Sequence, residues 1–243
     1  MGIASSDLAV MKAEFDERGF VLLKDFFDAE LMDRVDAAVR HHFGDVPQFQ
    51  HSDEFITLSR AEIIPWFPQR DPQSAPLFDE VDAYPGLATV TEALLGPGWS
   101  NLFSMAMHSR QGSAGQPWHQ DCPPEDASRF NLNRLIYCSP ITAEIGGEVA
   151  VIPGSHRLGE VPRGLASDDL PNELVLRPGK GHLLLLHGHC WHRVLPVHGG
   201  TRHSVNHRAG PIGVEAGITD ICVYRNMRYR FSTAEVLIDR LAQ

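Results

Sequence analysis

Residues 183–207 read LLLLHGHCWHRVLPVHGGTRHSVNH, and this stretch decides the fold class. Four successive leucines predict a short strand that is buried on both faces. Glycine and proline punctuate the chain soon afterwards, and 203–207 again has the length of a short strand. Short strands separated in this way are typical of a β-sandwich or barrel.

The same pattern of short strands separated by glycine and proline continues through the rest of the chain after Gly96. Short strands are expected at 101–108, 134–138, 148–152, 173–177, 182–187, 203–207 and 221–225. The first hundred residues instead repeat apolar side chains at helical spacing. Their expected elements are a helix that ends at Gly19, a strand at 20–23, a helix between Asp28 and Gly44, and a helix between Pro85 and Gly96. The predicted fold class is therefore mainly β with flanking helices.

Prolines recur between residues 47 and 84, so this segment is interpreted as a long loop with short helical turns, which would act as a lid. A last helix is expected at 233–241. No linker or repeat divides the chain. We predict a single domain over 1–243, with a helical part and lid loop at 1–99, a β core at 100–230 and a C-terminal helix at 231–243.

The composition excludes several classes of protein. With 31 acidic and 21 basic side chains the formal charge is −10, which would repel a phosphate backbone, so nucleic acid is not an expected partner. The apolar runs are too short to span a bilayer and the N-terminus lacks an apolar signal core. The expectation is a soluble cytoplasmic protein. The four cysteines form no C-x-x-C pair, so we expect reduced thiols.

The segment Pro117-Trp118-His119-Gln120-Asp121 carries a candidate metal site. At the strand period of two, His119 and Asp121 leave the same face and Gln120 leaves the other. One imidazole and one carboxylate, together with a later histidine, make the facial triad of non-haem iron enzymes. Alone, such a pair is more often a solvated strand end, so a downstream partner is needed.

Four histidines compete to be the third ligand, namely His187, His189, His192 and His198. His192 is favoured by its spacing to Arg202, ten residues later, with Ser204 two residues beyond. The guanidinium of Arg202 suits the distal carboxylate of 2-oxoglutarate, and the Ser204 hydroxyl lies on the same strand face. The other three histidines are interpreted as structural. The faces of His192 and Arg202 cannot be related from sequence, because the chain around Gly199 forms either a hairpin or a crossing between sheets.

Several motifs together resemble the phytanoyl-CoA dioxygenase (PhyH-like) family of Fe(II)/2-oxoglutarate oxygenases. They are the opening at 15–23, Trp118-His119-Gln120-Asp121, Gly146-Gly147 followed by Ile152-Pro153-Gly154-Ser155-His156, and the terminal pair of His192 and Arg202. The resemblance implies a double-stranded β-helix, also called a jelly roll or cupin-like fold. It also implies iron held by His119, Asp121 and His192, with 2-oxoglutarate and O2 as cosubstrates.

The resemblance further implies a 2-oxoglutarate contact from Tyr137, which could equally be a packing residue. Two positions depart from the family pattern. Gly181-His182 stands where the family has Gly-Asp, and Arg202 follows the histidine by ten residues instead of eleven, which leaves Arg208 as the alternative arginine.

The expected function is hydroxylation of an unactivated C–H bond of a small metabolite, with release of succinate and CO2. Asp121 argues against a halogenase, in which halide occupies the place of the carboxylate. Two alternatives remain at this point: a cupin-like metal enzyme that needs no 2-oxoglutarate, and a non-catalytic binding module of the same fold. The substrate, the reaction outcome and the oligomeric state stay open.

Overall fold

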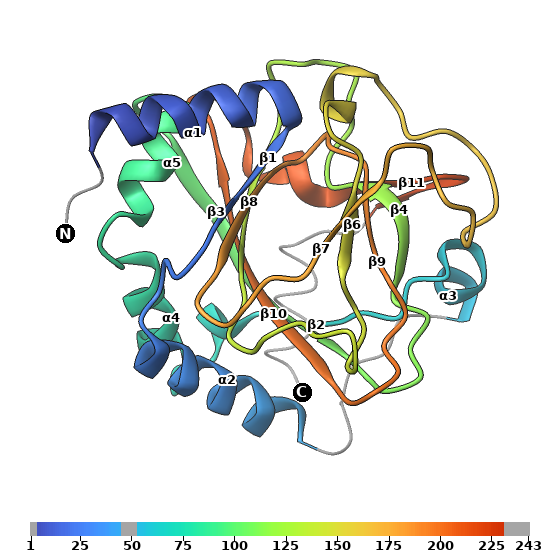
Figure 1. Cartoon of the computed structure of the whole chain (residues 1–243), viewed down its shortest axis with the longest axis horizontal. Helices are drawn as coiled ribbons and strands as arrows, with labels where there is room; N and C mark the ends of the chain where they lie inside the picture. The colour runs from blue at the N-terminus through green and yellow to red at the C-terminus, as the bar shows by residue number, and fades with distance from the viewer. Residues whose placement is uncertain (1–3, 45–52, 231–243) are drawn as a thin grey trace.

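A computed structural model describes residues 4–44 and 53–230, which form two six-stranded antiparallel sheets with most of the helices on one side and a short helix on the other (Figure 1). The helices are α1 (Ser5–Arg18), α2 (Ala29–Phe43), α3 (Asp53–Ser59), α4 (Ala75–Asp82) and α5 (Leu87–Leu95), with short 3-10 turns at Pro68–Arg70, Ser155–Arg157 and Ala216–Asp220. The helix expected at 233–241 lies outside the described residues.

The first sheet has the order β1-β8-β5-β10-β3-β2, and the second has the order β12-β11-β4-β9-β6-β7. The strands of the first sheet are β1 (Phe20–Leu23), β2 (Ile64–Trp66), β3 (Ser100–Ser109), β5 (Leu132–Ile136), β8 (Leu183–His187) and β10 (Arg202–Gly210). Those of the second are β4 (Gln116–Gln120), β6 (Val149–Val151), β7 (Leu174–Leu176), β9 (His192–Val194), β11 (Ile221–Tyr224) and β12 (Met227–Arg230). The predicted jelly-roll class is confirmed.

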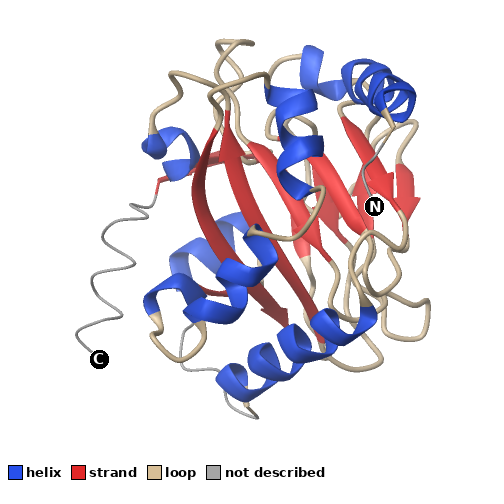
Figure 2. Cartoon of the chain, turned by 90° about the vertical axis from the view of Figure 1, so that its left-hand side faces the viewer, coloured by secondary structure: helices blue, strands red, loops and turns tan. Residues whose placement is uncertain are grey.

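The first sheet is covered on both faces, which explains the leucine run. Helices α1, α2, α4 and α5 pack on its outer face (Figure 2). Leu183 and Leu185 join the core beneath these helices, whereas Leu184 and Leu186 join the core between the two sheets. All four side chains are fully buried. A strand with two apolar faces therefore gives a continuous apolar run instead of an alternating one.

The long strand β10 separates its side chains by the same period of two. Val205 lies in the core beneath the helices, and His203 and His207 face Asp36 of α2 and Asp82 of α4. The alternate positions, Arg202, Ser204, Asn206 and Arg208, leave the opposite face, between the sheets. This strand therefore carries a row of polar side chains toward the interior of the jelly roll.

The segment 47–84 was expected to be a long loop with short helical turns, and its described part from residue 53 contains short helices but also a strand that was not expected. It contains α3, α4 and β2, and β2 pairs with β3 at the edge of the first sheet, with Pro65 opposite Met107. An edge strand tolerates proline because its outer side needs no backbone donor. Phe78 and Val81 of α4 are buried against the sheet. The role of this segment as a lid stays a prediction.

Smaller differences concern the ends and number of the elements. Strands β2, β4, β9 and β12 were not among the expected ranges, because strands of three to five residues carry little periodicity. No helix among the described residues is long and apolar enough to cross a membrane. The single domain over 1–243 stays a prediction.

Candidate active site

Neighbouring strands of the second sheet bring three polar side chains together. His119 on β4 lies directly opposite His192, the first residue of β9, and their ring centroids are 4.0 Å apart. Asp121 follows β4 immediately and faces the same way as His119. Trp118 and Gln120 face the other way, where Trp118 is packed in a separate apolar cluster and Gln120 donates to His189 O. The expected alternation along 117–121 is confirmed.

The three side chains converge through their acceptor atoms. His119 Nε2 lies 3.7 Å from Asp121 Oδ1, and His192 Nε2 lies 3.4 Å from Asp121 Oδ2. The other ring nitrogens face backbone carbonyls, with His119 Nδ1 2.8 Å from Pro117 O and His192 Nδ1 2.9 Å from Cys190 O. A carbonyl can only accept, so in each neutral imidazole Nδ1 carries the hydrogen and Nε2 offers a lone pair. Two lone pairs and a carboxylate thus meet at one point.

The electrostatics of this point favour a bound cation. Burial, together with the neighbouring His192, lowers the pKa of His119 to about 3, so its imidazole is neutral near pH 7. Burial opposes ionisation of Asp121, but the Arg208 guanidinium and the two neighbouring histidines together outweigh it and hold the pKa of this carboxyl well below its usual range. Neutral imidazoles and an ionised carboxylate are the forms that bind a metal ion.

Asp121 is held by two donors that the sequence did not assign to it. Arg208 Nη2 donates to Oδ1 at 2.8 Å, and Asn133 Nδ2 of β5 donates to Oδ2 at 2.8 Å. Asn133 is itself fixed, because its Oδ1 accepts from Asn206 at 2.9 Å and from Asn131 at 3.0 Å. Such partners orient a ligand carboxylate before the metal arrives.

A cysteine also lies close to the point of convergence. Ligand atoms of His119, Asp121 and Cys222 all lie within 4.8 Å of one another. Burial raises the pKa of the Cys222 thiol well above its usual range, and its Sγ donates to Gln120 O at 3.3 Å. A thiol that stays protonated is a poor ligand, because metals bind the thiolate. Sequence reasoning missed this residue, which comes from a strand about a hundred positions away.

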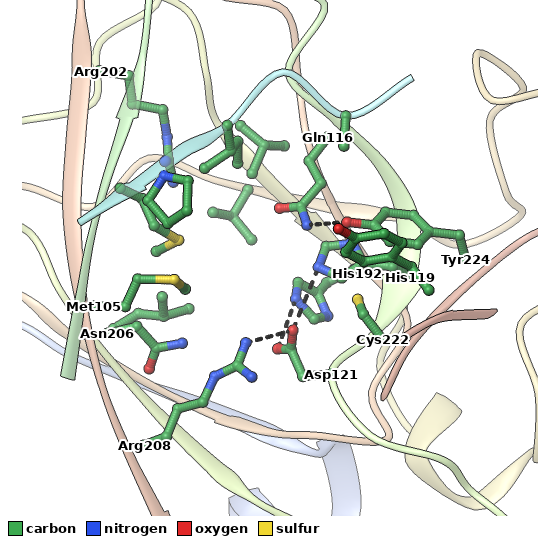
Figure 3. A pocket seen from close by; sticks show the side chains of 18 of the residues that line it. Met105, Gln116, His119, Asp121, His192, Arg202, Asn206, Arg208, Cys222 and Tyr224 are labelled. Carbon is green, nitrogen blue, oxygen red and sulfur yellow. Dashed lines mark hydrogen bonds and ion pairs between the residues drawn. The ribbon is translucent and has the colours of Figure 1, made fainter. Parts of the chain in front are cut away.

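These residues line one side of a cavity of about 130 Å³ between the two sheets (Figure 3). Arg202 lies across the cavity from the two histidines, and Arg208 approaches Asp121 from a third side. Gln116 donates to the Tyr224 hydroxyl at 3.0 Å, and the Tyr224 ring stacks over His119. Apolar side chains form much of the remaining wall, including Ile63, Pro65, Phe67, Met105 and Met107.

Arg202 is buried, which rules out the surface ion pair that is the usual role of an arginine. Its Nε donates to Gly147 O at 2.7 Å and its Nη1 donates to Ser204 Oγ at 3.1 Å. Burial lowers its pKa, and burial likewise raises the pKa of the neighbouring Tyr137. No acidic side chain pairs with Arg202 within residues 4–44 and 53–230. Arg202 is therefore a buried cation held ready for an anion.

The remaining histidines of the cluster lie elsewhere. His187 stacks on Phe130, with ring centroids 3.9 Å apart, and accepts through Nδ1 from the His189 backbone N–H. His198 Nε2 faces Ala143 O at 3.1 Å. None of the three histidines His187, His189 and His198 lines the cavity.

The chain between His192 and Arg202 passes from the second sheet to the first, so of the two expected paths around Gly199 the crossing between sheets is the correct one.

Comparisons with known proteins find a matching family and similar folds. A family model described as phytanoyl-CoA dioxygenase (PhyH) matches residues 15–204. No curated protein sequence matches the chain.

Solved structures with the same fold include the non-haem α-ketoglutarate-dependent epimerase SnoN from nogalamycin biosynthesis, with a TM-score of 0.67 at 14% identity, covering 91% of this chain and 87% of that one. HygX from Streptomyces hygroscopicus, solved with nickel, 2-oxoglutarate and hygromycin B, gives a TM-score of 0.66 at 13% identity, covering 87% and 88%.

Proposed function

Because the chain belongs to the phytanoyl-CoA dioxygenase family, we propose that His119, Asp121 and His192 hold the Fe(II) ion of a 2-oxoglutarate-dependent dioxygenase. Enzymes of this family use Fe(II), 2-oxoglutarate and O2, and the chain is an enzyme of this Fe(II)/2-oxoglutarate type. The observation that carries the assignment is that Nε2 of His119 and Nε2 of His192 both face the Asp121 carboxylate, while both Nδ1 atoms face backbone carbonyls. Two imidazoles and one carboxylate arranged in this way suit a divalent cation.

His192 is preferred over Cys222 as the third ligand. The Nδ1 hydrogen bond to Cys190 O aims His192 Nε2 toward Asp121. The Cys222 proton is instead used in a hydrogen bond to a backbone oxygen. Two histidines and one carboxylate leave positions open for the keto acid and O2, as the chemistry of this metal site requires.

Arg202 is proposed to bind the distal carboxylate of 2-oxoglutarate, with Ser204 and Tyr137 beside it. When the keto acid end chelates the metal, the far carboxylate lies several bonds away from the ligands. Arg208 is hydrogen-bonded to Asp121 itself, so its guanidinium lies too close to the metal ligands to bind the far carboxylate. Arg202 lies on the far side of the same cavity and has no acidic partner among the described residues. The charge-assisted fork of Arg202 suits a carboxylate there.

The bound iron would supply the oxidising chemistry with O2, and the residues of this chain bind, orient and exclude water. The polar row on β10 holds the cosubstrate and the metal carboxylate, and the apolar wall keeps bulk water from the site. We propose hydroxylation of a C–H bond of a small molecule as the reaction. SnoN is an epimerase of the same fold, so placement of the substrate in the cavity, and not the fold, selects the outcome.

Conversion of 2-oxoglutarate to succinate tests this proposal. The purified protein with Fe(II) and O2 should form succinate slowly without any substrate. Asp121→Ala should abolish this turnover, and Asp126→Ala, which changes an exposed acid in a neighbouring loop, should leave it intact. Succinate formation that survives Asp121→Ala would contradict the assignment, and a lack of succinate in the wild type would favour a metal enzyme without 2-oxoglutarate.

A further inference from the structure

Arg208 is a buried arginine whose hydrogen-bonding capacity is only partly used. Its side chain is 7% exposed and lines the cavity. Nη2 donates to Asp121, the guanidinium carbon lies 5.3 Å from the Phe103 ring centroid, and Nε is buried with no hydrogen-bond partner in the described part of the chain. An unpaired donor on a buried cation costs free energy, so we expect a bound ligand to supply the missing hydrogen-bond acceptor.

The charges around the cavity indicate what kind of acceptor it is. Among the described residues, the charged side chains that line it are Asp121, Arg202 and Arg208. A ferrous ion and the two arginines bring four positive charges, whereas Asp121 and the 2-oxoglutarate dianion bring three negative ones. Asp121 is shared between the iron and Arg208, so the filled site keeps one net positive charge, and Arg208 still has its unused donor at Nε. A cavity with largely apolar walls would leave this charge uncompensated.

We propose that Arg208 binds a carboxylate group of the primary substrate beside the iron, and this rests on the proposed function. A carboxylate carries the single negative charge that the site lacks and matches the arginine fork. Met105 and Phe67 on the nearby wall suit an aliphatic remainder. Asn206 lies two residues before Arg208 on the same face, and its Oδ1 is also buried without a partner among the described residues. It can accept from an N–H or O–H group of the same substrate.

The rival role for Arg208 is inside the reaction machinery. It could contact the metal-proximal carboxylate of 2-oxoglutarate, or it could serve only to orient Asp121. Both rivals predict that loss of Arg208 weakens binding of 2-oxoglutarate or of the metal. The proposal predicts instead that the largest loss falls on an added carboxylate ligand.

The test is a binding measurement on the anaerobic complex with Fe(II) and 2-oxoglutarate. Straight-chain monocarboxylates from acetate to octanoate, and their matched primary amides, are titrated by calorimetry. The best wild-type carboxylate should bind at least about tenfold more tightly than its amide, the factor expected for one charged hydrogen bond. Arg208→Met should remove this preference, and Arg208→Lys, which keeps the charge but loses the fork, should retain part of it.

Arg202→Met is the matched control, because it should weaken 2-oxoglutarate more than Arg208→Met does. Thermal unfolding checks that each variant is folded. If Arg208→Met does not fold, Arg208→Lys is used for the comparison in its place. Equal binding of carboxylates and amides to the wild type, or a preference that survives Arg208→Met, would overturn the proposal. So would a loss of 2-oxoglutarate binding in Arg208→Met as large as in Arg202→Met. If the wild type does not bind 2-oxoglutarate at all, the proposed function fails first.

Discussion

Gly147→Ala should weaken binding of 2-oxoglutarate although residue 147 touches neither the metal site nor the proposed cosubstrate position. Gly147 lies just before β6 with a φ of 74°, and its carbonyl accepts from Arg202 Nε at 2.7 Å. A Cβ at this position would lie 2.5 Å from Arg202 Cδ and 3.0 Å from Val197 Cγ2. The substitution therefore pushes directly on the side chain that is proposed to bind the distal carboxylate.

The size of the effect follows from these distances. Ordinary van der Waals contact begins at 3.4 Å, so Arg202 Cδ must move by roughly 1 Å. A misplacement of about 1 Å can cost on the order of a hundredfold where geometry is demanding, and we expect the Kd for 2-oxoglutarate to rise by about ten- to a hundredfold. The left-handed backbone adds a loss of about 1–2 kcal/mol in the free energy of unfolding.

Gly112→Ala provides the matched control. Gly112 has a φ of 85°, and no atom lies within 4 Å of the position that a Cβ would take there, so this residue meets the same backbone strain without the clash. The assay is anaerobic titration of each Fe(II) protein with 2-oxoglutarate, beside urea unfolding. Both variants should lose stability, and only Gly147→Ala should lose affinity. Equal Kd values for the two variants would refute the reasoning.

Three further predictions concern buried polar residues. His108→Asn should make folding less sensitive to acid, because burial lowers the pKa of His108 from 6.5 to about 4. Between about pH 7.5 and pH 5 this histidine gains a proton in the unfolded chain but not in the folded one, which favours unfolding. Over this range the free energy of unfolding, measured with urea, should fall by about 2 kcal/mol more in the wild type than in the variant. Asn133→Leu should weaken Fe(II) binding by about ten- to a hundredfold, because Asp121 loses an orienting donor; an unchanged metal titration would show that Arg208 alone orients the carboxylate. His189→Ala should keep its iron, since this ring lies outside the cavity, and complete loss of metal would contradict the choice of His192.

The periodicity of the sequence accounts for much of the site. The period of two along 117–121 predicted that His119 and Asp121 share a face, and the four leucines predicted a strand buried on both sides. The same period along β10 could also have placed Arg208 on the face of Arg202, because the two are six positions apart, which is an even number. Even spacing along one strand thus predicts a shared face for Arg208 as well, but the prediction from sequence extended only to Ser204.

Contacts between distant strands could not be predicted in this way. Asn133 reaches Asp121 from β5 of the other sheet, and Cys222 reaches the same point from β11. The proximity of Asn133 depends on how the two sheets face each other, and that of Cys222 depends on the pairing of β11 with β4 within the second sheet. No local pattern encodes either arrangement. The strand β2 within 47–84 was missed for a related reason, since the prolines around it suggested a loop while the strand is stabilised at the sheet edge by β3.

The central claim is that His119, Asp121 and His192 bind the iron that 2-oxoglutarate chelates. The most direct measurement is anaerobic addition of Fe(II) and then 2-oxoglutarate, followed through the visible charge-transfer band of the chelated keto acid, in the wild type, His192→Ala and Cys222→Ala. The account predicts the band in the wild type and in Cys222→Ala and its loss in His192→Ala. A band that persists in His192→Ala and vanishes in Cys222→Ala would contradict it.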